Sequence, residues 1–205
     1  MDGAPESVHG SPSTHDAPRG RKGESTVRAV LRLLGALVVV AGAGLAVLIW
    51  RGSEPGGIDD LYHAVVGGPD LGPVTFETLV RRSRPNDALA CPADLCRSAR
   101  PDIVPPLYPV SAERLREIVA DVARQDPETQ IVFSARWEEQ DRYVARTRLM
   151  RFPDTINVRV VPVAADAATV AIYSRSQLGY SDWGVNRKRI ERWLDAIAAR
   201  AGRDA

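Results

Sequence analysis

The sequence has few of the residues that build metal centres, disulfide scaffolds or histidine-dependent catalytic sites. Its 205 residues include three histidines and two cysteines. His9 and His15 lie within the first 25 residues, which are rich in Gly, Ser, Pro and charge and have almost no large apolar side chains. Such a segment cannot bury enough surface to fold, so both histidines fall outside any structured site. We therefore expect neither a metal site nor a cofactor.

An excess of charge of one sign is also absent. The chain has 27 Lys and Arg against 26 Asp and Glu, which leaves a net charge of +1. A general nucleic-acid-binding domain is strongly basic, so no nucleic-acid partner is expected. The hydrophobic content of 44% is typical of a globular protein.

The common catalytic signatures are missing. The sequence has no Gly-x-Ser-x-Gly elbow, no His-Glu-x-x-His pair and no Walker-type loop. The segment 179–184, GYSDWG, is one residue away from the elbow, but no histidine follows it to act as a base. We therefore assign no catalytic residue and leave enzymatic activity as an open alternative.

A long uncharged run does stand out. Residues 33–50 read LLGALVVVAGAGLAVLIW and are bracketed by Arg32 and Arg51, with Trp50 at an interfacial position. Eighteen helical residues rise about 27 Å, close to the thickness of the hydrocarbon core of a bilayer. This predicts a transmembrane helix over 26–51 after a disordered cytoplasmic tail over 1–25. A buried core helix or a cleaved signal peptide is the alternative, but the leading region and the apolar run are both long for a signal peptide.

The flanking charges predict the orientation. Basic residues dominate before the run and acidic residues are more frequent after it. By the positive-inside rule, the protein is a single-pass protein of the cytoplasmic membrane, with its N-terminus inside and its C-terminal domain outside.

The remaining sequence predicts one domain. Residues 52–72 read as a linker, and residues 73–109 as an extended, proline-punctuated coil with one helical turn near 76–80. A helix capped by Ser111 ends before Pro127, and a second helix opens at Ser181 and Asp182. Between them lie four strand-like runs, 131–137, 142–149, 156–163 and 168–175. We expect an α+β domain over 73–205, with an antiparallel four-stranded sheet and two helices on one face, in the order α-β-β-β-β-α.

Strand alternation gathers basic side chains on one face of this sheet. With the apolar faces turned toward the helices, the opposite face carries Arg146, Arg148, Arg159, Tyr173 and Arg175. The start of the last helix could add Asn186 and Arg187 as donors to an anion. In the alternative reading the arginines form ordinary ion pairs, and Ser181 and Asp182 cap the helix themselves.

Two further groups have structural readings. Asp154 follows Pro153 in a tight turn, and it could pair with Arg148 or Arg175. A catalytic pair of Asp154 and Asp182 is conceivable, but the sequence does not determine their separation. Outside the cytoplasm, Cys91 and Cys96 are candidates for a structural disulfide rather than a redox site.

Three stretches resemble a known family. They are PNDALACP at 85–92, RFPD at 151–154 and YSRSQLGYSDWGVNR at 173–187. Together they resemble the uncharacterised bacterial and plastid family called domain of unknown function 1499, over residues 68–200. Trp183 departs from the smaller residue that is more usual there. The resemblance implies no activity, but it does imply frequent association with membranes.

These observations predict a membrane-anchored extracytoplasmic module that binds an anionic small molecule, a lipid headgroup or an envelope partner. An envelope enzyme that uses carboxylates and arginines, and a scaffold without a ligand, are the alternatives. The sequence identifies no protein partner.

Overall fold

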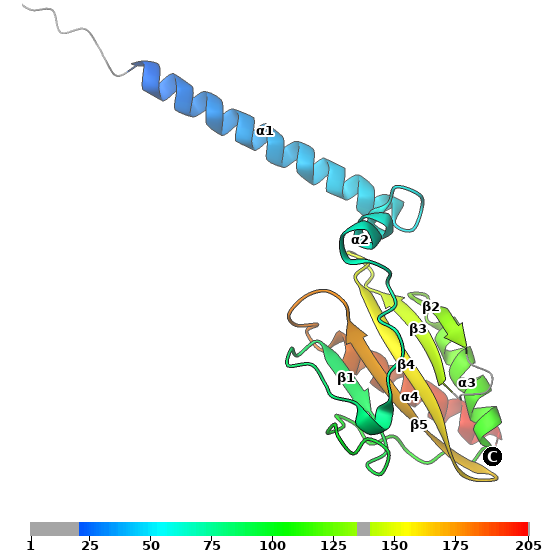
Figure 1. Ribbon diagram of the computed structural model, residues 1–205. Coiled ribbons are helices and arrows are strands. Elements are labelled where there is room, and N and C mark those ends of the chain that lie inside the picture. Colours follow the sequence, from blue (N-terminus) through cyan, green and yellow to red (C-terminus); the bar gives the residue numbers. More distant parts are fainter. Residues whose placement is uncertain (1–20, 135–139, 205) are drawn as a thin grey trace, which may run out of the picture. The chain divides into compact units, whose positions relative to one another are not determined.

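The computed structural model describes residues 21–134 and 140–204. The chain divides into two compact units, residues 1–46 and 47–205, which are described separately (Figure 1). Helix α1 runs over Arg21–Arg51. Arg21, Lys22 and Glu24 are good helix formers, so residues 21–25 continue the helix rather than belonging to a disordered tail. The rest of that predicted tail, 1–20, lies outside the described residues.

Within α1, Thr26–Arg51 is long and apolar enough to cross a membrane. None of this segment is buried against other residues, which distinguishes it from the core helix of a soluble protein. A signal sequence near the N-terminus would also be long and apolar enough to meet this criterion.

The predicted linker contains a helix, α2, over Ile58–Val66. Asp59 and Asp60 lie in its first turn, where negative charge favours the helix dipole. Ile58 is buried, so one end of α2 is packed into the second unit. The glycines that suggested a linker flank α2 instead, and Gly67 ends it with a φ of 87°.

The domain is α+β, as predicted, but its sheet has five strands. These are β1 (Asp87–Ala90), β2 (Thr129–Ser134), β3 (Gln140–Arg146), β4 (Pro153–Ala164) and β5 (Ala167–Ser176). Their order is β1-β5-β4-β3-β2, and every neighbouring pair is antiparallel. The four predicted strands correspond to β2–β5, although residues 135–137 of the first lie outside the described residues.

The additional strand, β1, lies in the stretch predicted to be coil. Its register pairs Leu89 with Tyr173 of β5, far along the chain. Three of its four residues are buried, so it has no alternation of apolar and polar side chains to indicate a strand. A short segment of this kind becomes a strand only because β5 offers a free edge.

Helices α3 (Ala112–Gln125) and α4 (Val185–Asp204) cover one face of the sheet (Figure 1). Ser111 caps α3 as predicted, since its Oγ accepts a hydrogen bond from the Arg114 amide at 3.2 Å. The main core lies between these helices and the sheet and includes Leu115, Ile156 and Ile190. Helix α4 begins at Val185, after the predicted opening at Ser181 and Asp182, because a turn with Gly184 at φ 78° precedes it.

The opposite face of the sheet is also covered. Figure 1 shows the segment that follows α2 running across β4, and we call residues 68–78 the strap. The strap ends in the 3-10 turn η1 (Phe76–Thr78), and Phe76 packs in a second buried cluster with Leu89 and Tyr173. The same cluster contains the disulfide between Cys91 and Cys96, which are both buried.

Candidate functional site

The three stretches that resemble the family meet at one end of the sheet. There β3 ends, β4 begins and β5 ends, because the register pairs Arg146 with Pro153 and Asp154 with Ser176. The segment before β1 joins them, since Asn86 Nδ2 donates to the Gly179 carbonyl at 2.9 Å. We call this end of the sheet the α2 end, because α2 contacts it as well.

Contacts with α2 hold this end in place. The Asp59 carboxylate pairs with Arg151 at 2.7 Å and with Arg146 at 3.0 Å. The Tyr62 hydroxyl donates to the Met150 carbonyl at 2.7 Å. Burial and the nearby Asp59 charge raise the pKa of Tyr62, so the hydroxyl stays protonated and keeps donating. These bonds join α2 to the β3–β4 loop, residues 147–152.

The register places four of the predicted anion-binding residues on the face of the sheet opposite the helices. They are Arg146, Arg159, Tyr173 and Arg175. Arg146 pairs with Asp59, and Arg159 pairs with Glu77 of the strap at 2.6 Å. A backbone hydrogen bond and the Arg159 side chain lower the pKa of Glu77, so this partner stays ionised. Arg146 and Arg159 thus each have a carboxylate partner.

Arg175 and Tyr173 are also engaged. Arg175 Nη2 donates to the carbonyls of Leu71 and Gly72, at 3.1 and 2.9 Å, and burial lowers the pKa of its guanidinium. The Tyr173 hydroxyl donates to Asp87 at 2.6 Å, and burial followed by that carboxylate raises its pKa. The strap therefore uses much of the hydrogen-bonding capacity that an anion would need.

The other predicted donors lie apart from this face. Arg148 follows β3, has a side chain 92% exposed and comes within 3.8 Å of Glu128. Arg187 forms an exposed pair with Glu191 along α4. Asn186 is buried on the helix side of the sheet, where its side chain bonds Ser174 and Ser176. The structure does not gather the seven residues into one site.

A buried polar network lies beneath the α2 end, on the helix side. Arg189 Nη2 donates to Asp154 at 2.8 Å, and the two side chains are 3% and 2% exposed. Arg189 Nη1 also donates to Asn186 Oδ1 at 2.7 Å and to Ser174 Oγ at 3.1 Å. A buried charge needs such partners, so this network holds α4 to β4 and β5. Asp154 pairs with Arg189 rather than with Arg148 or Arg175.

The turn before α4 satisfies its own donors. Asp182 accepts hydrogen bonds from the amides of Gly184 and Asn186 and from the Asn186 side chain, at 2.9, 3.0 and 2.7 Å. Ser181 Oγ accepts from the Trp183 amide at 3.3 Å. These contacts occupy the positions that a bound anion would take at the helix start. Asp154 and Asp182 each have structural partners, so their arrangement does not favour paired acid–base chemistry.

An apolar pocket of about 310 Å³ opens at the α2 end, between the β3–β4 loop and the β5–α4 loop. Half of its lining residues have apolar side chains, and these come from both sides of the pocket: Leu149, Met150, Phe152, Leu178, Trp183 and Val185. Asp154, Ser176 and Asp182 reach its inner side from the polar network. A volume near 300 Å³ lies at the lower end of the range for small-molecule sites. The lining suits an apolar group better than a polar ligand.

Large exposed side chains occur in both loops that form this pocket. Leu149, Tyr180 and Trp183 are 71%, 72% and 90% exposed, and we call these three residues the apolar rim. Trp183 also has a φ of 54°, in a region that bulky residues rarely occupy. A large side chain held in a strained backbone and turned to solvent gains almost nothing from packing, so its presence points to a role in contact with something else.

The family comparison agrees with the region that forms this domain. The model of a family described as "Protein of unknown function (DUF1499)" matches residues 80–197. The chain belongs to the DUF1499 family. The match includes β1–β5, α3 and most of α4. Of the site, only α2 and the strap lie outside the matched residues. No curated protein and no solved structure matches the chain. The DUF1499 assignment thus covers the sheet and the helices on its face, and it carries no activity with it.

The sequence analysis did not predict some residues of this DUF1499 site. Arg189 is the main one, although a charged residue beside the apolar stripe of Ile190, Trp193 and Ile197 is a usable signal of a buried pair. Leu149 and Met150 form another signal, because apolar residues are unusual in a turn between strands. Among residues 21–134 and 140–204, no cluster of His, Cys, Asp and Glu could hold a metal ion.

Proposed function

We propose that this DUF1499 protein is a membrane-anchored module that binds a lipid through the pocket at the α2 end. Residues 33–50 form the anchor, the N-terminus lies in the cytoplasm, and the domain lies outside. Three features support this placement: the apolar composition of α1, the basic residues before it, and the Cys91–Cys96 disulfide, which is typical of oxidising compartments.

The pocket carries the proposal about the ligand. An acyl chain fits its apolar lining, and Arg148 lies between the lining residues Thr147 and Leu149 with its guanidinium in solvent. A phosphate headgroup at the mouth would therefore meet a positive charge while the chain occupies the interior. The ligand class is an anionic lipid with a flexible acyl chain.

The arginines on the sheet face opposite the helices are a weaker candidate for the ligand site. Arg146 and Arg159 have carboxylate partners, and Arg175 bonds strap carbonyls. An anion there would have to displace the strap. The lipid proposal needs no such rearrangement, because the pocket is open as it stands.

Photo-cross-linking of the full chain in lipid nanodiscs tests the proposal. The discs contain an anionic phospholipid with a diazirine near the end of one acyl chain. After irradiation, peptide mapping should find cross-links in α1, which serve as an internal control, and in residues 147–152 and 178–185. Cross-links confined to α1 would disprove lipid binding in the pocket.

One position offers matched variants. Val185 lines the pocket at the start of α4 and is 38% exposed, so a larger side chain can enter the pocket without disturbing the core. Val185→Phe should lower cross-linking of the two loops several-fold, whereas Val185→Ala should retain it. Both variants should leave cross-links in α1 unchanged. Equal loop labelling in the two variants would show that the pocket is not the binding site.

The orientation has its own test. A reporter enzyme that works only outside the cytoplasm, fused after residue 205, should be active. Activity restricted to a cytoplasmic reporter would reverse the proposed topology.

A further inference from the structure

The β3–β4 loop, which lines the pocket, contacts the chain just after the last residue of α1. Gly52 follows Arg51, the last residue of α1. A methyl group on Gly52 would lie 3.5 Å from Arg151 Cδ, so the β3–β4 loop contacts the chain immediately after α1. The Asp59 carboxylate then ties Arg151 in place.

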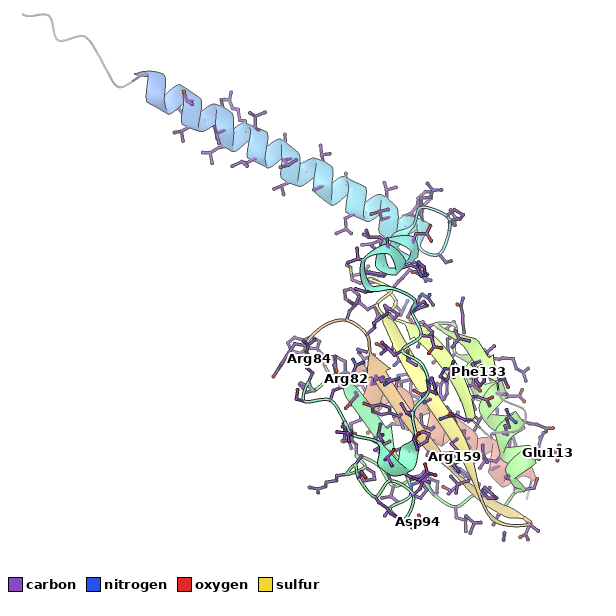
Figure 2. The ribbon with its side chains drawn as sticks, in the orientation of Figure 1. Arg82, Arg84, Asp94, Glu113, Phe133 and Arg159 are labelled. Atoms are coloured by element: carbon purple, nitrogen blue, oxygen red, sulfur yellow. A yellow bond between two sulfur atoms is a disulfide. The ribbon has the colours of Figure 1, made fainter. Side chains whose placement is uncertain are left out.

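The side chains at this end have the composition of a bilayer interface. The apolar rim combines one aliphatic residue, a tyrosine and a tryptophan, and aromatic residues of these two types favour the headgroup region. Exposed arginines flank the rim: Arg148 beside Leu149, and Arg82 and Arg84 on the segment before β1. Figure 2 shows Arg82 and Arg84 beside the β5–α4 loop, where Arg82 Nη1 donates to the Ser176 carbonyl at 3.3 Å.

We propose that the apolar rim docks into the headgroup region of the anchoring bilayer, with the three flanking arginines on anionic headgroups. The anchor is the reason for proposing the bilayer rather than a protein as the binding partner of the rim. If residues 33–50 span the bilayer, Gly52 lies at its surface, and so does the loop that touches Gly52. A protein partner would have to compete with lipid that is already adjacent. The strained, exposed Trp183 is explained by the same contact, because its ring packs against lipid rather than protein.

Docking rests on the anchoring part of the proposed function and goes beyond the pocket. It places the pocket mouth at the lipid surface, so that an acyl chain could enter the pocket without crossing water. It also holds the domain in one orientation, which a single transmembrane helix alone would not do.

Tryptophan quenching by lipid tests the inference on the full chain in nanodiscs that contain brominated anionic lipid. Every variant carries Trp137→Phe, and buried Trp193 gives a constant background. The first variant keeps Trp50 and carries Trp183→Ser, so it reports on α1. The second carries Trp50→Phe and keeps Trp183. The third carries Trp50→Phe and Trp183→Ser, with Val104→Trp as a matched control at an exposed position on another surface of the domain.

Docking predicts strong quenching of Trp50 and Trp183 and little quenching of the residue at 104. Quenching of Trp50 without quenching of Trp183 would overturn docking and leave the anchor intact, as would be expected if the rim binds a protein instead. Equal quenching of Trp183 and the residue at 104 would also overturn it, because it would show no preferred orientation. No quenching of Trp50 would refute the anchor and docking together.

The arginines and the pocket can be separated in the same assay. Arg148→Gln with Arg84→Gln should reduce Trp183 quenching at least twofold in anionic lipid and change it little in zwitterionic lipid. Val185→Phe should leave Trp183 quenching unchanged while it lowers pocket cross-linking. Loss of Trp183 quenching in Val185→Phe would refute an independent docking surface.

Discussion

Replacing Arg189 by alanine tests the buried network that holds α4 to the sheet. The substitution leaves the Asp154 carboxylate, 2% exposed, without its charged partner. It also removes the donors to Asn186 Oδ1 and Ser174 Oγ. Breaking a buried pair by removing one partner costs about 3–5 kcal/mol. A domain of this size is stable by about 5–15 kcal/mol, so the loss is a large share of the total.

The assay is pulse proteolysis of the full chain in detergent micelles over a urea gradient. With a urea slope of about 2 kcal/mol per M, a loss of about 4 kcal/mol lowers the midpoint by about 2 M. Arg187→Ala is the matched control, because its exposed pair with Glu191 is worth at most about 0.5 kcal/mol. The double variant Asp154→Asn with Arg189→Met removes both charges of this buried pair, so it should be more stable than Arg189→Ala alone.

A midpoint for Arg189→Ala within about 0.3 M of the Arg187→Ala midpoint would refute the reasoning, since this corresponds to no more than a surface pair at the same slope. It would mean that the Asp154 carboxylate is not held by Arg189 in the folded chain. A double variant less stable than Arg189→Ala would refute the argument from uncompensated charge in particular.

Three more predictions concern stability. Burial raises the pKa of three core tyrosines, so the folded state keeps their protons at a pH where the unfolded chain, with a pKa of about 10, loses them. These are Tyr108, Tyr143 and Tyr173. The free energy of unfolding should therefore be unaffected by these groups below about pH 10 and should be lower by about 4 kcal/mol at about pH 11. Circular dichroism over a pH series would follow this loss. Full tyrosinate absorbance in a chain that is still folded would contradict this. Reducing Cys91–Cys96, which are five positions apart, should cost about 2 kcal/mol and leave the domain folded, as measured by urea unfolding with and without reductant. Trp183→Gly removes the backbone strain of a bulky residue at φ 54° and loses little packing, so this variant should be as stable as the parent or up to about 1 kcal/mol more stable. Gly184→Ala introduces such strain at φ 78°, so it should be less stable than the parent.

Local patterns predicted much of the fold. The spacing of Leu115, Ile118 and Val122 behind Ser111 was enough to place α3, because a capped amphipathic helix is recognisable from its own residues. Alternation in the two longest strands placed Arg159 and Arg175 on one face, and the register of β4 and β5 agrees. The family resemblance was correct for the same region.

The candidate site was harder to predict. Its pocket is formed by two turns about 30 positions apart in sequence, 147–152 and 178–185, and neither turn has a repeating pattern. The strap was also missed, because its bonds to Thr155, Asn157 and Arg159 join residues more than 80 positions apart. Those bonds, together with Asp59, explain why the arginines of the sheet face have partners that their own strands do not supply.

By itself, the sequence determined the apolar helix before the domain, the α+β class and the faces of the long strands. Each of these depends on residue type and short-range spacing, which local physics decides. Only the tertiary structure decided that β1 joins the sheet, that Asp154 pairs with Arg189 and that the strap covers the arginines. It also decided that Leu149 and Trp183 line one pocket. These contacts depend on which segments the folded sheet brings together, and no local pattern encodes that choice.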